Sequence, residues 1–143
     1  MSPTWQQIKH VQVTFAIIAA KVDVVPELFY RRLFELDPSL RHLFEHDMAK
    51  HRRMLMQMLT FAIYSLRDTE AITPILQQFG DCQAASGILK CHYVTFRNAL
   101  IWTLEQSLGN TFTLEVKEAW QSVLESLVSI ATEGLYSEIT DVM

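Results

Sequence analysis

The chain has 143 residues, of which 50% are hydrophobic and 20% charged, and its formal net charge at pH 7 is −4. This length and composition predict one globular domain over residues 1–143, and the negative charge argues against nucleic acid as a partner. The apolar stretches are shorter than a membrane span, and the N-terminus lacks an export signal. Cys82 and Cys91 fit a reducing compartment, so the sequence predicts a cytoplasmic protein.

The low content of glycine and proline predicts an all-α fold with long helices and short joins. A first helix is expected within residues 4–25, which contain neither glycine nor proline. Asp23 is expected to cap a second helix that has Pro26 in its first turn. Asp37 is expected to cap a short helix that begins at Pro38.

The second half of the chain also predicts helices. Asp47 begins a long helix whose apolar residues recur every three or four positions. Thr73-Pro74 and Gly80 are expected to divide the next region into short helical pieces. A long, largely buried helix is expected over residues 90–108. Thr113 is expected to cap the last helix.

Six segments in this order resemble bacterial single-domain globins, the family of the flavohaemoglobins and related haemoglobins. They are Leu28–Pro38, Leu43-Phe44, Asp47–Leu59, His92-Tyr93, Trp102–Gly109 and Phe112–Trp120. The resemblance covers roughly residues 5–135. It implies the globin fold, with about seven to eight helices in a three-over-three sandwich, and haem as the cofactor.

On the distal side, the resemblance implies four residues that contact haem. Phe44 matches the aromatic residue that wedges against the macrocycle, and Leu55 matches the apolar residue over it. Tyr30 matches the tyrosine whose hydroxyl donates to bound oxygen, although a buried hydroxyl can equally donate to a backbone carbonyl. His51 stands where these globins usually carry glutamine. Its imidazole can bind iron or a ligand, unless it is a solvated member of the basic run 50–53.

On the proximal side, a Gly-x-x-His step places the iron-binding histidine of the family, and here the step is Gly80-Asp81-Cys82-Gln83. A glutamine amide is a weak donor, whereas haem proteins use His, Cys, Met or Tyr as axial ligands. The resemblance implies that haem lies between the distal helix and a short helix at about 81–86, and the weakness of glutamine as a donor leaves His51 as the best-placed iron ligand. Tyr93 matches a tyrosine that bonds the proximal ligand, and it can bond Gln83 instead.

Three hypotheses for function remain open. The first, favoured by the expected apolar pocket, is a tetrapyrrole-binding globin that binds a diatomic gas or senses gas or redox state. Catalysis is not expected, because the chain has no nucleophile–base pair, phosphate loop or reductase domain. The second is a haem-free regulatory or interaction module, dimeric through its last two helices, with Phe79, Phe96 and Met54 filling the pocket. The third is a bilin attached to Cys82.

Overall fold

The fold is all-α in a computed structural model of the chain, as the sequence predicts. The structure describes residues 3–85, 87–88 and 90–132, without the side chains of Thr69, Gln83 and Lys90. This part contains seven α-helices: α1 (Trp5–Ala19), α2 (Val24–Leu36), α3 (Arg41–Phe44), α4 (Met48–Tyr64), α5 (Thr69–Ala85), α6 (Lys90–Leu108) and α7 (Leu114–Thr132). Short 3-10 helices lie between some of them: η1 (Pro38–Leu40), η2 (Glu45–Asp47) and η3 (Gly109–Thr111).

Two of the three predicted caps, Asp37 and Thr113, are confirmed, and Asp47 caps the helix that it was predicted to begin. The carboxylate of Asp37 accepts a hydrogen bond from the backbone N–H two residues on, and Pro38 begins the 3-10 helix that follows. The carboxylate of Asp47 and the hydroxyl of Thr113 each accept from the N–H three residues on, at 3.2 Å. These bonds satisfy donors at helix starts that have no partner within the helix.

The prediction for Asp23 is wrong. Its side chain makes no capping bond, and its backbone is already in the right-handed helical region. The carbonyl of Lys21 instead accepts from the N–H groups of Val24 and Val25, at 3.2 and 3.1 Å. The preceding turn therefore satisfies two of the donors that a capping side chain would serve.

The predicted breaks at Thr73-Pro74 and Gly80 are also wrong, because α5 runs through them as one helix. Pro74 removes one backbone hydrogen bond from it. Ile72 and Leu76, on either side of the proline, are buried, and α5 packs against α7. Burial of this apolar face outweighs the local preference for a break.

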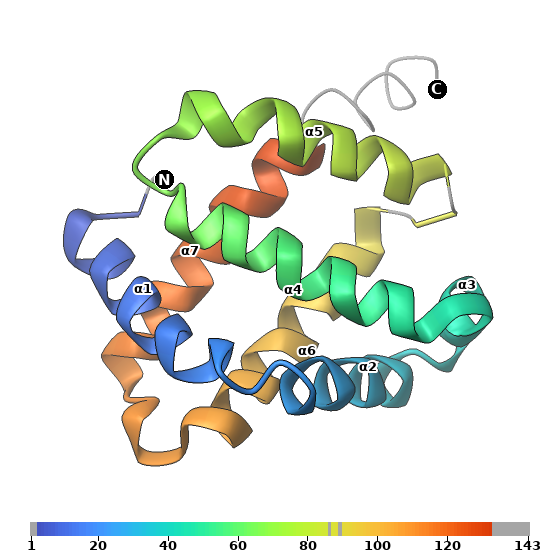
Figure 1. Cartoon of the computed structure of the whole chain (residues 1–143), viewed down its shortest axis with the longest axis horizontal. Helices are drawn as coiled ribbons and strands as arrows, with labels where there is room; N and C mark the ends of the chain where they lie inside the picture. The colour runs from blue at the N-terminus through green and yellow to red at the C-terminus, as the bar shows by residue number, and fades with distance from the viewer. Residues whose placement is uncertain (1–2, 86, 89, 133–143) are drawn as a thin grey trace.

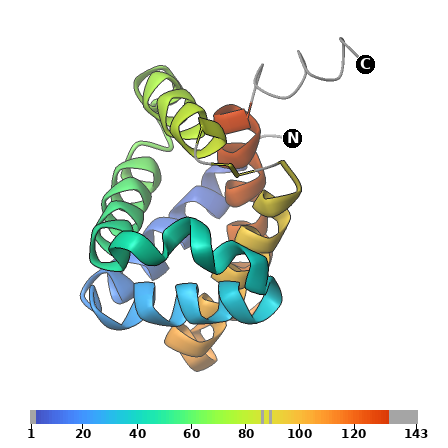
Figure 2. The same cartoon turned by 90° about the vertical axis from the view of Figure 1, so that its right-hand side faces the viewer.

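The helices lie in two layers. In Figure 1, α4 crosses in front of α6 and α7, and Figure 2, turned by 90°, shows α4 on one side of the molecule and α6 and α7 on the other. α1 packs against α7 and α4, while α2 packs against α6 and α4. Among the described residues, no helix is both long and apolar enough to cross a membrane.

A buried hydrogen bond joins the first helix to the last. The indole N–H of Trp120 donates to the hydroxyl of Thr14 at 2.9 Å, and that hydroxyl donates to the backbone carbonyl of His10 at 2.7 Å. The ring of Phe15 packs against Trp120 at 6.3 Å between centroids. This chain of donors and acceptors fixes how α1 lies on α7.

We expect Thr14→Val to lower the free energy of unfolding by about 1–3 kcal/mol, because the buried indole N–H of Trp120 loses its acceptor. Thr103→Val is the matched control. Thr103 is fully buried, and its hydroxyl donates to the carbonyl of Ala99 within the same helix. Its replacement should cost about 1 kcal/mol or less. Urea unfolding followed by circular dichroism measures both losses, and equal losses would contradict the role assigned to Thr14.

Candidate functional site

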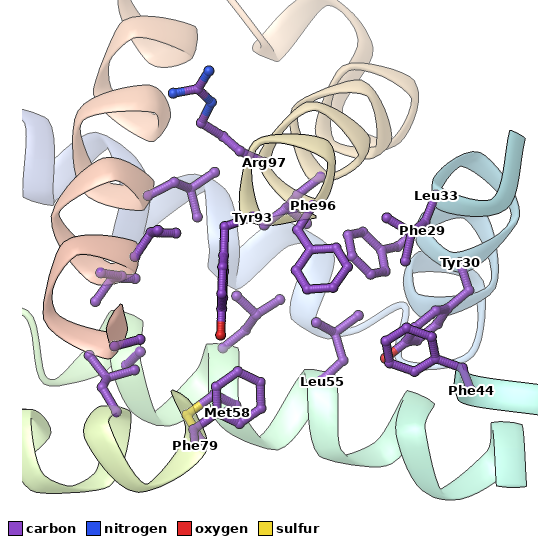
Figure 3. Close-up of a pocket in the computed structure, with 18 residues that line it drawn as sticks. Phe29, Tyr30, Leu33, Phe44, Leu55, Met58, Phe79, Tyr93, Phe96 and Arg97 are labelled. Atoms are coloured by element: carbon purple, nitrogen blue, oxygen red, sulfur yellow. The ribbon is translucent and has the colours of Figure 1, made fainter. Parts of the chain in front are cut away.

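A cavity of about 140 Å³ lies between the two layers (Figure 3). Its walls come from α2, the end of α3, and α4 to α7. Among the described residues that line it, only two tyrosines and one arginine are polar. The lining residues are Phe29, Tyr30, Leu33, Phe44, Leu55, Met58, Leu59, Ala62, Leu76, Phe79, Tyr93, Phe96, Arg97, Leu100, Leu124, Leu127, Val128 and Ala131.

Four aromatic rings pack together at one end of this cavity. Phe29 and Tyr30 meet edge to face at 5.0 Å between centroids, and Phe29 lies 6.5 Å from Phe96. Phe44 lies 5.5 Å from Tyr30 and 6.3 Å from Phe96. Edge-to-face rings attract each other beyond the burial of their area, so this cluster joins α2, α3 and α6.

Tyr30 lines the cavity and is bonded to α4. Its hydroxyl donates to the backbone carbonyl of His51 at 3.3 Å, the backbone alternative considered from the sequence. Burial raises the pKa of the Tyr30 hydroxyl well above its ordinary value, and the charge of Arg52 opposes this only in part. The hydroxyl is therefore a neutral donor at physiological pH.

His51 lies beside the cavity, and its ring is not among the groups that line it. Its half-buried imidazole packs edge-on against Phe44, at 5.0 Å between centroids and 81° between planes. Leu55, one turn further along α4, does line the cavity. The structure thus brings Tyr30, Phe44, His51 and Leu55 to the same end of the site.

At the other end, α5, α6 and α7 provide the walls. Leu76 and Phe79 of α5 line the cavity, and Figure 3 shows the hydroxyl of Tyr93 directed toward Met58 and Phe79. Gln83 follows Phe79 by four residues in α5, and its side chain lies outside the described part of the structure. The predicted short helix at about 81–86 is, as far as residue 85, the end of this long helix.

Other residues singled out in the sequence lie away from the cavity. Cys82 and Cys91 are exposed and not joined in a disulfide. Met54 is exposed on the outer side of α4, so the prediction that it fills the pocket is wrong. His92 lies with its Nε2 3.9 Å from a carboxylate oxygen of Asp37. The described residues contain no group of three His, Cys, Asp or Glu side chains able to hold a metal ion.

The sequence did not point to Arg97 and Glu125, which meet between α6 and α7. Nη1 of Arg97 lies 3.1 Å from Oε1 of Glu125. A second hollow of about 310 Å³ opens beside them, and Tyr93, Arg97 and Val128 line both this outer hollow and the cavity. The sequence did contain one signal for Arg97. Its charge lies four residues after Tyr93, on the same face of a helix that was predicted to be largely buried.

The cavity fits the cofactor implied by the sequence in its chemistry and less well in its size. Apolar and aromatic walls with a few polar groups are typical of cofactor sites. A cavity of about 150 Å³ holds a molecule such as benzene. This cavity has a volume of about 140 Å³, so its lining side chains would have to move apart to admit a tetrapyrrole. His51 on α4 is a donor suited to iron.

Comparisons with known proteins give one family and several relatives. The family model described as Globin matches residues 27–131. Neuroglobin of Danio rerio is 26% identical over an alignment of 121 positions, and the match covers 75% of this chain and 76% of that protein. Neuroglobin of Tetraodon nigroviridis is 24% identical over the same shares of the two chains.

Two solved structures share the fold. A hexacoordinated haem protein of an anhydrobiotic tardigrade has a TM-score of 0.84 at 11% identity, over 92% of this chain and 94% of its own. An engineered carbene transferase, a candidate nitric oxide dioxygenase of Rhodothermus marinus, has a TM-score of 0.85 at 20% identity, over 99% of this chain and 100% of its own.

The stability of the protein is expected to decline above about pH 10 in a way that depends on Tyr30. The pKa of Tyr30 in the folded state is raised above the unfolded value of about 10. The contribution of its neutral hydroxyl to the free energy of unfolding is therefore complete below that pH and is lost as the pH rises. We therefore expect Tyr30→Phe to flatten the fall in unfolding free energy between about pH 9 and pH 11. Urea unfolding at several pH values across this range measures the free energy of unfolding. The exposed Tyr64 supplies the control Tyr64→Phe, and an equal flattening there would contradict the prediction.

Proposed function

The chain belongs to the globin family, and we propose that it is a bacterial-type, single-domain haem-binding globin over residues 1–143, with His51 as its protein ligand to iron. The observation that carries the proposal is the apolar cavity between α4 and the pair α6 and α7, with a histidine at its edge. Haem, when bound, supplies an iron atom to which a diatomic gas can bind.

The distal residues have suitable chemistry for this role. Phe44 and Leu55 would pack against the macrocycle, and a ring nitrogen of His51 would hold the iron. The imidazole now packs on Phe44 and would have to turn toward the cavity when haem enters. Tyr30, neutral and bonded to the carbonyl of His51, would keep the start of α4 in position.

On the proximal side, we propose that Gln83 occupies the position of the usual histidine and Tyr93 lies beside it. A glutamine amide binds iron weakly, so the face opposite His51 would be open or weakly filled. A haem face on which a weak ligand can be exchanged suits a gas or redox sensor better than a permanent oxygen store. We propose a binding role without catalysis. A cytoplasmic location and a homodimer through α6 and α7 remain predictions.

A haem-free globin acting as a regulatory or interaction module is the alternative, and the volume of the cavity favours it. At about 140 Å³ the space is that of a single ring rather than a tetrapyrrole, because Phe79 and Phe96 are among the side chains that line it. Attachment of a bilin to Cys82 stays a minor hypothesis.

An absorption spectrum of protein purified from cells supplied with haem precursor, followed by a titration with hemin, distinguishes the two main functions. A Soret band at one haem per chain that survives gel filtration supports the haem-binding globin. A folded, helical protein without such a band supports the haem-free module and rejects the proposal.

We expect His51→Ala to abolish the Soret band at one haem per chain, because the substitution removes the proposed iron ligand. His46→Ala is the matched control, since His46 is exposed in the turn before α4. This control should keep the native band at full intensity. An unchanged spectrum in His51→Ala would remove His51 from the proposed mechanism.

We expect Gln83→His to change the ferrous spectrum to a six-coordinate one, because imidazoles at positions 51 and 83 could then both bind the iron. The exposed Gln78 on the same helix supplies the control Gln78→His, which should not change the ferrous spectrum. If Gln83→His fails to bind hemin, the cavity is closed to haem by the packing of its side chains rather than by the lack of an axial ligand.

A further inference from the structure

Arg97 lies at the boundary between the cavity and the outer hollow. Among the described lining residues of the cavity, it is the one with a formal charge. Figure 3 shows its guanidinium directed away from the rings of Tyr93 and Phe96, so the carbon stem borders the cavity and the charged end lies outside. Arginine commonly divides its contacts in this way, with the stem on apolar surface and the head in a polar setting.

The two spaces adjoin at this residue. Tyr93, Arg97 and Val128 line both, and the outer hollow adds the hydroxyl-bearing Ser129 and Thr132. A molecule that extends past Arg97 would have one end among apolar side chains and the other among polar ones. The arrangement therefore suits an amphiphile rather than a wholly apolar or wholly polar ligand.

The partner of Arg97 is easily replaced. The Glu125 side chain is 65% exposed, whereas that of Arg97 is 32% exposed. Exposed ion pairs contribute little to stability, because water and salt screen them and both side chains lose freedom. A ligand carboxylate can accept from the same guanidinium, and its apolar tail would gain burial that Glu125 does not have.

We propose that the protein binds a free apolar monocarboxylate, such as a medium-chain fatty acid, through Arg97. The tail lies in the cavity, and the carboxylate takes the place of Glu125 on the guanidinium. A single tail suits the volume of about 140 Å³ better than a two-tailed lipid does. The site uses no iron ligand, so the proposal does not depend on haem binding, although haem and the tail would occupy the same cavity.

Equilibrium dialysis with decanoate and with decanol tests the proposal on the chain as purified and again after hemin loading. We expect saturable binding of one decanoate per chain in at least one form, about tenfold or more tighter than decanol. Arg97→Met should weaken decanoate binding by about tenfold to a hundredfold and leave decanol unchanged. Glu125→Gln should strengthen decanoate binding by about threefold or more, since it removes the competing carboxylate.

Two variants control for folding and for the position of the tail. Arg53→Met removes an exposed cation from α4 and should leave decanoate binding unchanged. Ala131→Leu adds volume at a buried lining position and should weaken both ligands. Circular dichroism establishes that each variant is folded.

Several outcomes would overturn the proposal. These are equal affinity for decanoate and decanol, an unchanged affinity in folded Arg97→Met, or weaker binding of decanoate in Glu125→Gln. The proposal is also rejected if decanoate binds neither to the chain as purified nor to the hemin-loaded chain. It is likewise rejected if the protein takes up decanoate only from phosphatidylcholine vesicles that contain the acid and not from solution. Failure of hemin to bind affects the haem proposal alone, because decanoate is measured without it.

Discussion

Ring contacts among Phe29, Tyr30, Phe44 and Phe96 are the constraint on which the interior depends. They join α2, the end of α3 and α6, with centroids 5.0 to 6.5 Å apart. Such rings are large and rigid, so they fill one end of the interior without filling the space beyond them. The cavity is that remaining space. The bond from Tyr30 to the carbonyl of His51 ties α4 to the same cluster.

The all-α globin fold predicted from the sequence is confirmed, and the successful details are local ones. Asp37, Asp47 and Thr113 cap helices through atoms two or three residues away, so a short piece of sequence contains both partners. The failures at Asp23 and Pro74 have a different cause. At Asp23 the preceding turn satisfies the same donors, and at Pro74 packing on α7 outweighs local preference.

Part of the site could be predicted from the sequence, because the residues that form its walls follow a family pattern. Tyr30, Phe44, Leu55 and Tyr93 all line the cavity, and each was identified from its motif. Side-chain direction was not accessible in this way: the ring of His51 lies against Phe44 because of contacts between α3 and α4. Arg97 and Glu125 are 28 residues apart, and only the packing of α6 on α7 brings them together.

In their chemistry the apolar walls suit a tetrapyrrole and an acyl chain alike, so polar groups help to decide which occupant the cavity prefers. Under the two proposals, iron would use the imidazole of His51 on α4, whereas a carboxylate would use the guanidinium of Arg97 on α6, across the cavity from α4 (Figure 3). Either occupant would stabilise the folded chain by mass action in proportion to its affinity. Because the two polar groups stand on different helices, a change at one leaves the other intact. If Gln83 stands at the proximal position, as proposed, its weak affinity for iron would shift the preference away from haem and leave the core and the carboxylate site as they are.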